Sequence, residues 1–483
     1  MKPAANSRDF VVFNLNGQLC KVGGDEALLN LSDYLRRQKN LTGTKIVCSE
    51  GDCGACSVLR AYSRPNSTHA PDFEVINSCI TRVAQLDGSF LLSIEGIALG
   101  GELDSIQQSM IECNASQCGF CTPGFVMAMA DHFEDHCEEL DPQKLKNALT
   151  GNLCRCTGYE SIISAGTKTK RQHEKTLAKR YISADKISEL GDFQKISIAI
   201  QGSTETFFAP SNEQELSELR NSHPNSIIMA AGTDLGVQKN KHDRITPVLI
   251  SLHLIPSLYR LEIQNSRVQV GARVTLTELR KVLKDKCDEI CDFLNIFASP
   301  QIKNVGTLVG NIANASPIAD TPPMMLALNA EIQIWNPKTL EIRSLKIDQF
   351  YLAYKKINLS PGEVIFSISF DLPQKNEILQ LKKLSQRRDL DISTVNTAFF
   401  KGSEVGQYRL AVGGVAATPL RLKKTEGYLQ KNNLNPQSIS EALKIANSEI
   451  SPISDLRGSD SYRRLVLRNL LQNFLSEESN GSR

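Results

Sequence analysis

Two pairs of cysteines in the first third of the chain constrain its fold and chemistry more than any other feature. Cys118 and Cys121 form a C-x2-C motif within QCGFCTPG, and Cys154 and Cys156 form a C-x-C motif within GNLCRCTGY. Four thiols that come from two chain segments usually bind a metal ion or a metal cluster. The rest of the sequence must therefore be explained around a metal site.

Length, charge and apolar content narrow the class of protein. A chain of 483 residues is too long for one ordinary hydrophobic core, so we expect several domains. The 55 basic and 53 acidic residues give a net charge of +2, which argues against a nucleic-acid-binding protein. The sequence has no apolar run that could span a membrane and no signal peptide at its N-terminus. We therefore expect a cytoplasmic protein that binds neither nucleic acid nor membrane.

The 13 cysteines favour metal or redox chemistry, because a cytoplasmic chain does not keep structural disulfides. Eight of them fall into two groups of four. The other five lack motif spacing and are expected to be small buried side chains: Cys20, Cys113, Cys137, Cys287 and Cys291.

Residues 8–96 have the pattern of a small α+β domain. The Asn16-Gly17 pair predicts a hairpin between two strands, and the spacing of leucines over 28–38 predicts a helix. A glycine-rich loop, CSEGDCGACSV, follows, with short strands expected near Val58, over 73–76 and over 90–94.

This loop has the C-x4-C-x2-C spacing of a plant-type [2Fe–2S] site. Gly51 and Gly54 would let backbone N–H groups approach the cluster sulfurs closely. A zinc site is the alternative, although zinc motifs usually pair two C-x2–4-C units. The candidate ligands are Cys48, Cys53, Cys56 and Cys79.

Residues 97–165 are expected to be all-helical. Asp104 is a candidate helix cap, and Thr122-Pro123 and Asp141-Pro142 both predict helix starts. Gly151 is a natural residue to follow the end of the last of these helices. The four cysteines of this domain would then lie at helix ends, which suits an anionic second [2Fe–2S] cluster. Structural zinc remains the alternative from these residues alone.

The remainder reads as a basic linker followed by α+β domains. Residues 166–198 are rich in Lys and Arg and are expected to be an exposed connector. In the next domain, small residues over 227–237 and 297–323 would bring the backbone close to a ligand. Neither stretch is a P-loop or a G-x-G-x-x-G motif. They predict either a phosphate-bearing cofactor or tight packing turns. Strands and then helices are expected over 379–478, with SQRRDLDIS in a strand-like region.

The order of these motifs resembles the molybdenum hydroxylase family, and within it the small iron–sulfur and flavin subunits of bacterial xanthine dehydrogenases. The resemblance rests on CGFCTPG, NLCRCTGY, AAGTDLGV, GNIANASPIAD and SQRRDLDIS. It implies a multidomain α+β fold. The implied parts are a β-grasp ferredoxin-like domain (8–96), a four-helix [2Fe–2S] domain (97–165), the basic linker (166–198), a two-part FAD-binding domain of the vanillyl-alcohol-oxidase type (199–375) and a C-terminal α+β subdomain (379–478).

The resemblance also implies two [2Fe–2S] clusters and one FAD. The implied cluster ligands are Cys48, Cys53, Cys56 and Cys79 for the first, and Cys118, Cys121, Cys154 and Cys156 for the second. The implied FAD residues are Ala231, Gly232, Thr233, Asp234, Leu235, Phe297, Gly310, Asn311, Ser316, Pro317, Asp320 and Lys424. Ala231 and Val309 stand where relatives often have glycine, and Asn314 stands where threonine is frequent. Side chains at Ala231 and Val309 would restrict positive φ in these turns.

The implied function is electron transfer within a xanthine dehydrogenase. A larger partner subunit would carry molybdenum and oxidise hypoxanthine and xanthine to urate. No catalytic residue for purine hydroxylation is expected on this chain. Electrons would pass through the clusters to FAD and on to NAD⁺, with Gln117 at the partner interface and two copies of each chain in a heterotetramer. The alternatives are a molybdenum hydroxylase for aldehydes or N-heterocycles, or a stand-alone electron carrier.

Overall fold

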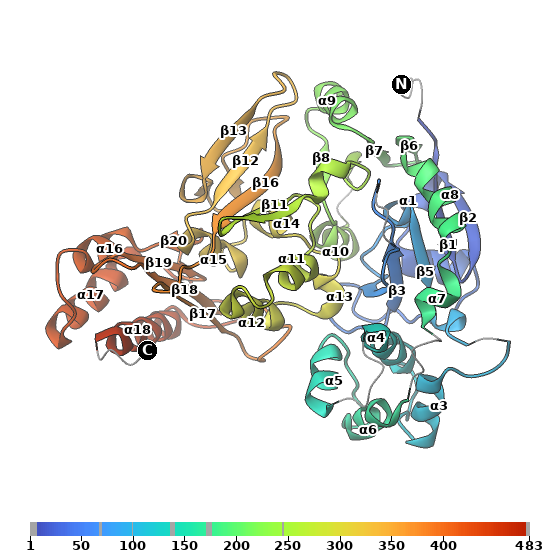
Figure 1. The fold of residues 1–483 in the computed structure, drawn as a ribbon, viewed down its shortest axis with the longest axis horizontal. Coiled ribbons are helices and arrows are strands. Elements are labelled where there is room, and N and C mark those ends of the chain that lie inside the picture. Colours follow the sequence, from blue (N-terminus) through green and yellow to red (C-terminus); the bar gives the residue numbers. More distant parts are fainter. Residues whose placement is uncertain are drawn as a thin grey trace. The chain divides into compact units, whose positions relative to one another are not determined.

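The computed structural model describes residues 7–66, 70–98, 100–135, 141–170, 176–243 and 246–479 (Figure 1). The chain divides into two compact units. Unit 1 comprises Met1–Ser257 with Ser299–Gly306, and unit 2 comprises Leu258–Ala298 with Thr307–Arg483. The region expected to bind FAD, 199–375, is therefore shared between the units. Among the helices described, none is long and apolar enough to cross a membrane.

Unit 1 begins with a five-stranded mixed sheet in the order β2-β1-β5-β3-β4. The predicted hairpin is confirmed, with Asn16 and Gly17 at φ values of 50° and 90°, as a tight two-residue turn requires. Strand β5 returns parallel to β1. The strands are β1 (Phe10–Leu15), β2 (Gln18–Gly23), β3 (Ser57–Tyr62), β4 (Glu74–Asn77) and β5 (Ser89–Leu92).

The helix predicted over 28–38 is found over 31–38, and only its start at Leu28 is wrong, because the chain is interrupted at Asn30. Asn30 is extended, at φ −65° and ψ 143°, and the N–H of Leu31 donates to the carbonyl of Thr81 at 2.7 Å. A main-chain contact from a distant segment thus replaces one helical hydrogen bond. The elements here are α1 (Gly24–Leu28), which ends before the interruption, and α2 (Leu31–Asp33), which continues directly into the π-helix η1 (Tyr34–Gln38).

Four helices form the next part of unit 1, and the predicted caps hold two of them. The Asp104 carboxylate accepts from Ile106 N–H, and that of Asp141 accepts from Gln143 N–H, each at 3.0 Å. Helix α4 packs against β3, which joins this helical part to the first sheet. The helices are α3 (Ser105–Glu112), α4 (Thr122–Asp135), α5 (Pro142–Ala148) and α6 (Glu160–Lys168). Because α5 ends at Ala148, the prediction that Gly151 directly follows the helix end is wrong.

The expectation of an exposed linker over 166–198 is also wrong for the residues described there. Leu177 and Leu190 are buried in the core of unit 1, and Gln194 Nε2 donates to the carbonyl of Ser63 at 2.8 Å. The segment forms helices α7 (Leu177–Tyr181) and α8 (Ala184–Gln194). Its apolar side chains lie on one face, so the basic residues that suggested a connector occupy the other faces. Residues 171–175 lie outside the described chain.

A second sheet completes unit 1, in the order β6-β7-β9-β8. Strand β9 pairs in parallel with β7 and with β8. The elements are β6 (Ile198–Gln201), β7 (Thr206–Ala209), α9 (Glu213–Ser222), β8 (Ile227–Met229), α10 (Thr233–His242), β9 (Val248–Ser251) and η5 (Pro256–Tyr259, which runs into unit 2). The short helix α13 (Pro300–Lys303) also belongs to unit 1.

Unit 2 contains two larger sheets. The first has the order β10-β11-β16-β12-β13, with β10 (Leu261–Gln264), β11 (Arg267–Gly271), β12 (Glu331–Trp335), β13 (Ile342–Lys346) and β16 (Val364–Asp371). The small pair β14 (Tyr351–Ala353) and β15 (Lys356–Ile357) follows η6 (Ile347–Gln349). Helices of this part are α11 (Leu276–Leu283), α12 (Asp288–Ile296), α14 (Leu308–Ala313) and α15 (Thr321–Ala327).

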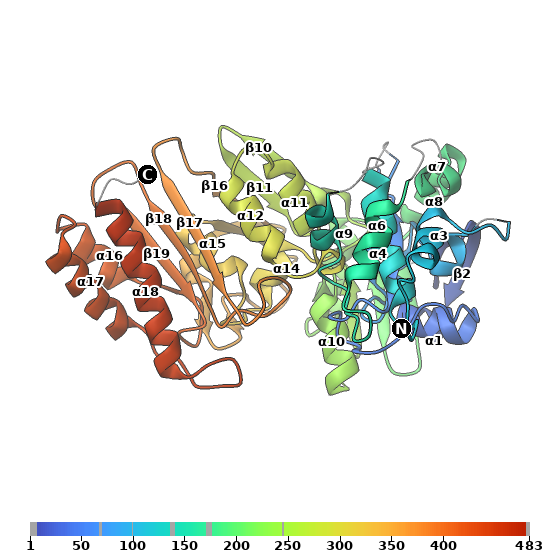
Figure 2. The same ribbon diagram turned by 90° about the horizontal axis from the view of Figure 1, so that it is seen from below.

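The second sheet of unit 2 is antiparallel, with β17 (Ile378–Leu384), β18 (Val395–Lys401), β19 (Tyr408–Gly413) and β20 (Leu420–Arg421). Helix α15 packs against β18 and β19 (Figure 2). Helices α16 (Lys423–Leu429), α17 (Pro436–Glu449) and α18 (Asp460–Ser479) form a layer with a shared apolar core. The SQRRDLDIS segment is a loop rather than a strand, because Leu390 is at φ 67° and Arg387 N–H donates to the Asp391 carboxylate. The multidomain α+β fold class predicted from the sequence is confirmed.

Candidate functional site

The first cysteine quartet comprises Cys48, Cys53, Cys56 and Cys79, and all four thiols lie together in unit 1. Hydrogen bonding from the Cys53 thiol, and then from that of Cys79, lowers the pKa of Cys48, and the Cys79 thiol likewise lowers the pKa of Cys56. The N–H groups of Glu50 and Cys53 lie 3.5 and 3.4 Å from Cys48 Sγ. Such donors stabilise thiolates, the form in which cysteine binds metal.

The backbone of the loop turns around these thiols. Ser49, Gly51 and Gly54 all lie in the left-handed region, at φ values of 57°, 78° and 68°. The side-chain nitrogen of Asn77 donates to the Gly51 carbonyl at 3.0 Å, which ties the loop to strand β4. The glycines that the sequence singled out therefore allow the turn that gathers the ligands.

Asn240 on helix α10 also holds this loop, and sequence reasoning missed it. Its Nδ2 donates to the carbonyls of Ser49 and Cys79, at 2.9 and 2.8 Å, and so bridges the two parts of the first quartet. Its Oδ1 accepts from Asn30 Nδ2 at 2.7 Å. No local pattern marks an asparagine in a helix as a support for a cysteine loop that is distant in the sequence.

The second cysteine quartet comprises Cys118, Cys121, Cys154 and Cys156. The Sγ atoms of Cys118 and Cys156 are 3.5 Å apart, and the thiols of Cys121 and Cys154 are hydrogen-bonded to each other. Burial opposes ionisation of Cys154, but hydrogen bonds from Thr157 and from the Cys156 N–H outweigh it and lower the thiol pKa to about 7. Cys154 is buried, whereas Cys118 and Cys156 are exposed.

The thiols of each quartet contact other thiols of the same quartet. Within the ranges that the structure describes, no group of three or more His, Cys, Asp or Glu side chains is arranged to hold one metal ion. Cys118 contacts Cys156 and Cys121 contacts Cys154, while Cys48 contacts both Cys53 and Cys79, and Cys79 also contacts Cys56. A [2Fe–2S] cluster takes four thiolates, two on each iron, so four cysteines whose thiols contact one another fit that group.

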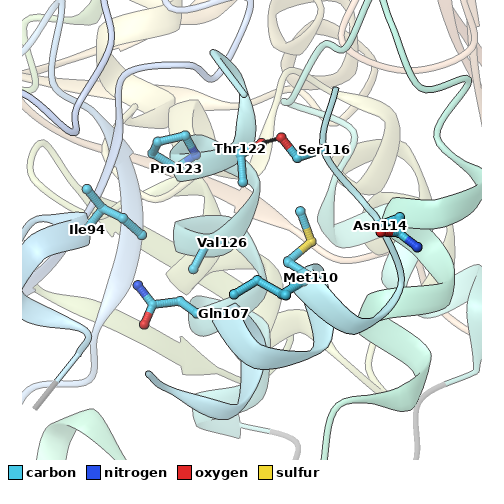
Figure 3. Close-up of a pocket in the computed structure, with 9 residues that line it drawn as sticks. Ile94, Gln107, Met110, Asn114, Ser116, Thr122, Pro123 and Val126 are labelled. Atoms are coloured by element: carbon cyan, nitrogen blue, oxygen red, sulfur yellow. Dashed lines mark hydrogen bonds between the residues drawn. The ribbon is translucent and has the colours of Figure 1, made fainter. Parts of the chain in front are cut away.

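A hollow of about 380 Å³ lies beside the second quartet, between α3 and α4 (Figure 3). Thr122 Oγ1 and Ser116 Oγ are 3.1 Å apart at its edge, and both flank the Cys118–Cys121 loop in sequence. The wall is mostly apolar, and Ile111 is 61% exposed there. The lining residues are Ile94, Gln107, Met110, Ile111, Asn114, Ser116, Thr122, Pro123 and Val126.

The first predicted FAD turn, Ala231–Leu235, lies in unit 1 at the start of helix α10. Gly232 is at φ 80°, while Ala231 is outside the left-handed region, so alanine is compatible with this turn. Gln85 Nε2 donates to the Ala231 carbonyl at 2.6 Å and fixes it. Thr233, Asp234 and Leu235 form the first turn of the helix, whose N–H groups carry partial positive charge. This geometry fits a phosphate, although the Asp234 carboxylate also lies in that turn.

The second predicted FAD segment lies in unit 2. Gly310 and Asn311 are in α14, and Asn311 Oδ1 accepts from Thr321 Oγ1 at 2.6 Å. The carbonyl of Pro317, next to Ser316, accepts from Gly414 N–H at 2.8 Å. Val309 is also outside the left-handed region, so the departures from glycine at 231 and 309 cause no backbone strain.

Asp320 and Phe297 both lie next to Lys383, which sequence reasoning missed. Lys383 Nζ is 2.7 Å from Asp320 Oδ2 and 5.9 Å from the centre of the Phe297 ring. Ser393 and Asn396 also donate to the Asp320 carboxylate, so this buried anion is satisfied by protein groups. Lys424 lies at the exposed start of α16, where its N–H donates to Glu449, outside this group.

Three family models match separate parts of the chain. The model described as "[2Fe-2S] binding domain" matches residues 93–167. The model "FAD binding domain in molybdopterin dehydrogenase" matches 199–374, and "CO dehydrogenase flavoprotein C-terminal domain" matches 381–478. The chain thus has a [2Fe–2S]-binding domain and an FAD-binding domain.

Individual known proteins are also similar to this chain in sequence or in fold. Xanthine dehydrogenase 1 of Arabidopsis thaliana is 30% identical over 89% of this chain and 37% of its own length. Aldehyde oxidase 4 of Mus musculus is 26% identical over 98% of this chain and 39% of its own length. The chain thus spans less than two fifths of these relatives. A carbon monoxide dehydrogenase structure from Hydrogenophaga pseudoflava shares the fold over 55% of this chain and 94% of its own, with a TM-score of 0.52 and 23% identity.

Proposed function

We propose that this chain, an iron–sulfur flavoprotein of the molybdenum hydroxylase family, carries electrons from a molybdenum-containing partner to NAD⁺ in a xanthine dehydrogenase. The observation that carries this proposal is the presence of two thiol quartets in one unit, each with its thiols in contact, on a chain that also has an FAD-binding domain. The purine substrate rests on the similarity to xanthine dehydrogenase 1 of Arabidopsis thaliana. A cytoplasmic location is part of the proposal, because metal-binding thiols are best preserved in a reducing compartment.

The chain's own residues prepare the sites for these groups. When bound, the clusters transfer one electron at a time, and FAD can take up single electrons and pass on two together. Cysteine thiolates would hold the irons, and the N–H groups of Glu50 and Cys53 stabilise negative charge on Cys48. The N-terminal turn of α10 would bind the FAD diphosphate, with Gly232 providing the required backbone turn. Phe297 and Lys383 offer an aromatic face and a buried cation in unit 2.

The partner would dock over the second quartet. Cys118, Cys156 and Gln117 are exposed. Two aromatic residues within three positions of these cysteines, Phe120 and Tyr159, are 47% and 38% exposed. A partner that covers this surface would shield the outer thiols and receive electrons over a short distance. We propose a larger molybdenum-cofactor subunit as this partner, in a heterotetramer with two copies of each chain.

Metal analysis and co-purification test the proposal. We expect four irons, four labile sulfides and one FAD per chain, and a larger molybdenum-bearing protein that purifies with it. Replacing Cys156 with serine should block electron transfer from purine to NAD⁺ but preserve NADH oxidation by artificial acceptors, because the flavin end remains intact. Equal loss of both activities would contradict the order of centres, and stoichiometric zinc would contradict the clusters.

A second candidate function is the same electron transfer in an aldehyde-oxidising or N-heterocycle-oxidising enzyme. The similarity of this chain to aldehyde oxidase 4 supports this second candidate. The assembled enzyme should be assayed with hypoxanthine, an aromatic aldehyde and quinoline at equal concentrations. A kcat/KM for hypoxanthine below that for either of the others would replace the purine assignment and leave the electron-transfer role in place.

A further inference from the structure

The loops of the two quartets are hydrogen-bonded to each other. Leu153 N–H donates to the Cys53 carbonyl at 3.0 Å, and Asn152 Nδ2 donates to the Gly54 carbonyl at 3.2 Å. We call Cys53, Gly54, Asn152, Leu153 and Gln301 the quartet junction. Cys53 belongs to the first quartet, and Leu153 directly precedes Cys154 of the second.

The junction connects a thiol of one quartet to a thiol of the other. From Cys53 Sγ the route follows that residue's covalent bonds to its carbonyl oxygen. It then crosses one hydrogen bond to Leu153 N–H and continues by covalent bonds to Cys154 Sγ. Covalent bonds and hydrogen bonds couple electron donors and acceptors better than empty space does. A displacement of this one hydrogen bond would therefore weaken the connection.

Gln301 fastens the junction from a third segment of the chain. It is 1% exposed, and its Nε2 donates to Asn152 Oδ1 at 2.9 Å and to Ser57 Oγ at 3.2 Å. Ser57 Oγ in turn donates to the Gly54 carbonyl at 2.7 Å. Gln301 thus holds Asn152 on the second loop and, through Ser57, Gly54 on the first.

The oxygen and the nitrogen of the Gln301 amide differ in their contacts. Gln301 Oε1 is buried without a hydrogen-bond partner among the described residues, and such an atom costs about 1–3 kcal/mol. The nitrogen makes both hydrogen bonds of the amide, and without it Asn152 Oδ1, on a buried residue, would lose this donor. The contribution of the amide therefore lies in what its nitrogen holds.

Missing side chains allow the loops to come this close. A Cβ at Gly151 would overlap Gln301 Oε1, and a Cβ at Gly124 would overlap the carbonyl oxygen of Gly54. A Cβ at Gly54 itself would lie 2.6 Å from Asn152 Nδ2. This explains Gly151, which was expected to end a helix: it makes room for Gln301 instead.

We propose that Gln301 is a positioning residue for electron transfer between the two iron–sulfur sites, because it holds the hydrogen bond between Leu153 and Cys53 in place. One electron crosses the junction in each step: one metal site is oxidised by one electron as the other is reduced, and no bond forms or breaks. The proposal deepens the proposed function and rests on its assignment of two clusters.

The test compares three variants of the full chain, each purified with its clusters. Gln301→Met keeps the length of the side chain but removes the donor, and Gly151→Ala displaces Gln301 without changing it. The control is Asn304→Ala, which removes a hydrogen bond from the same segment to the Val75 carbonyl but leaves the junction intact. Iron content is measured first. Electron exchange between the clusters is then followed after flash reduction, and their magnetic interaction is recorded by EPR in the fully reduced protein.

We expect all three variants to hold four irons, with slower electron exchange and a smaller magnetic splitting in Gln301→Met and Gly151→Ala only. Full iron content with unchanged exchange in both variants would overturn the proposal but not the proposed function. Loss of iron from Gln301→Met would also overturn it, because Gln301 would then hold a cluster rather than the contact between clusters. Wild-type protein with fewer than four irons would instead refute the two-cluster assignment.

Discussion

Asn240 provides a quantitative test of how the first quartet is held. Asn240→Ala removes the two hydrogen bonds to the Ser49 and Cys79 carbonyls and the one from Asn30. A typical intramolecular hydrogen bond contributes about 0.5–1.5 kcal/mol. Because Asn240 is only partly buried, water can replace some of these hydrogen bonds in the variant. We therefore assign a loss of about 2 kcal/mol to the three hydrogen bonds together. That energy corresponds to about 30-fold more frequent opening of the loop.

Iron release measures this opening. The first-quartet EPR signal should disappear about 30-fold faster in Asn240→Ala than in wild type when an iron chelator is added, while the second-quartet signal decays unchanged. Lys241→Ala is the matched control, since Lys241 lies on the same helix and reaches the same loop through Glu50, but in an exposed ion pair of 3.5 Å. Equal release rates in the two variants would refute the reasoning, and so would faster loss of the second signal.

Two further predictions concern a buried ion pair and the FAD turn. Burial alone would raise the pKa of Glu205, but the ion pair with Arg82 outweighs burial and lowers it. The pair therefore stabilises the fold at pH values above the ordinary glutamate pKa of about 4.3. This stabilisation is lost as the pH falls through the lower pKa that Glu205 has in the folded protein. Glu205→Gln should therefore cost about 3–5 kcal/mol in urea unfolding at pH 7 and reduce the loss of stability below pH 4; an unchanged acid profile would contradict this. Gly232→Val should lower FAD content but not iron content, because φ is 80° and a Cβ would lie 2.7 Å from Met229 Sδ. The control Gly427→Ala, at a helical site with open space, should keep its FAD, and equal FAD loss in both would refute this role of the turn.

The features that sequence reasoning predicted well are those fixed by neighbouring residues. The Asn16-Gly17 hairpin and the Asp104 and Asp141 caps depend on side chains and backbone within a few positions. The cysteine motifs are equally local, and the structure brings the thiols of each quartet together as their spacing predicts.

The features that were missed depend on contacts between distant segments. Asn240 and Gln301 support the cysteine loops from helices far along the chain. Asn240 belongs to no motif, and Gln301 lies in the 297–323 stretch, which was interpreted only as a cofactor site or a set of packing turns. Lys383 was read only as part of a strand, although it pairs with Asp320 in the fold. The helices over 176–198 were missed because the Lys and Arg residues of this region suggested an exposed connector, and the face shared by its apolar residues is seen only when it packs.

The uneven exposure of the two quartets has a consequence for biogenesis. Cys56 and Cys79 are enclosed by protein, whereas Cys118 and Cys156 face solvent. Iron held at the outer thiols would be open to oxygen and chelators in a newly made chain until another surface covers it. The survival of this iron site would then depend on the time between metal insertion and subunit association. A cell that makes this protein would have to insert the metal and then associate the subunits quickly.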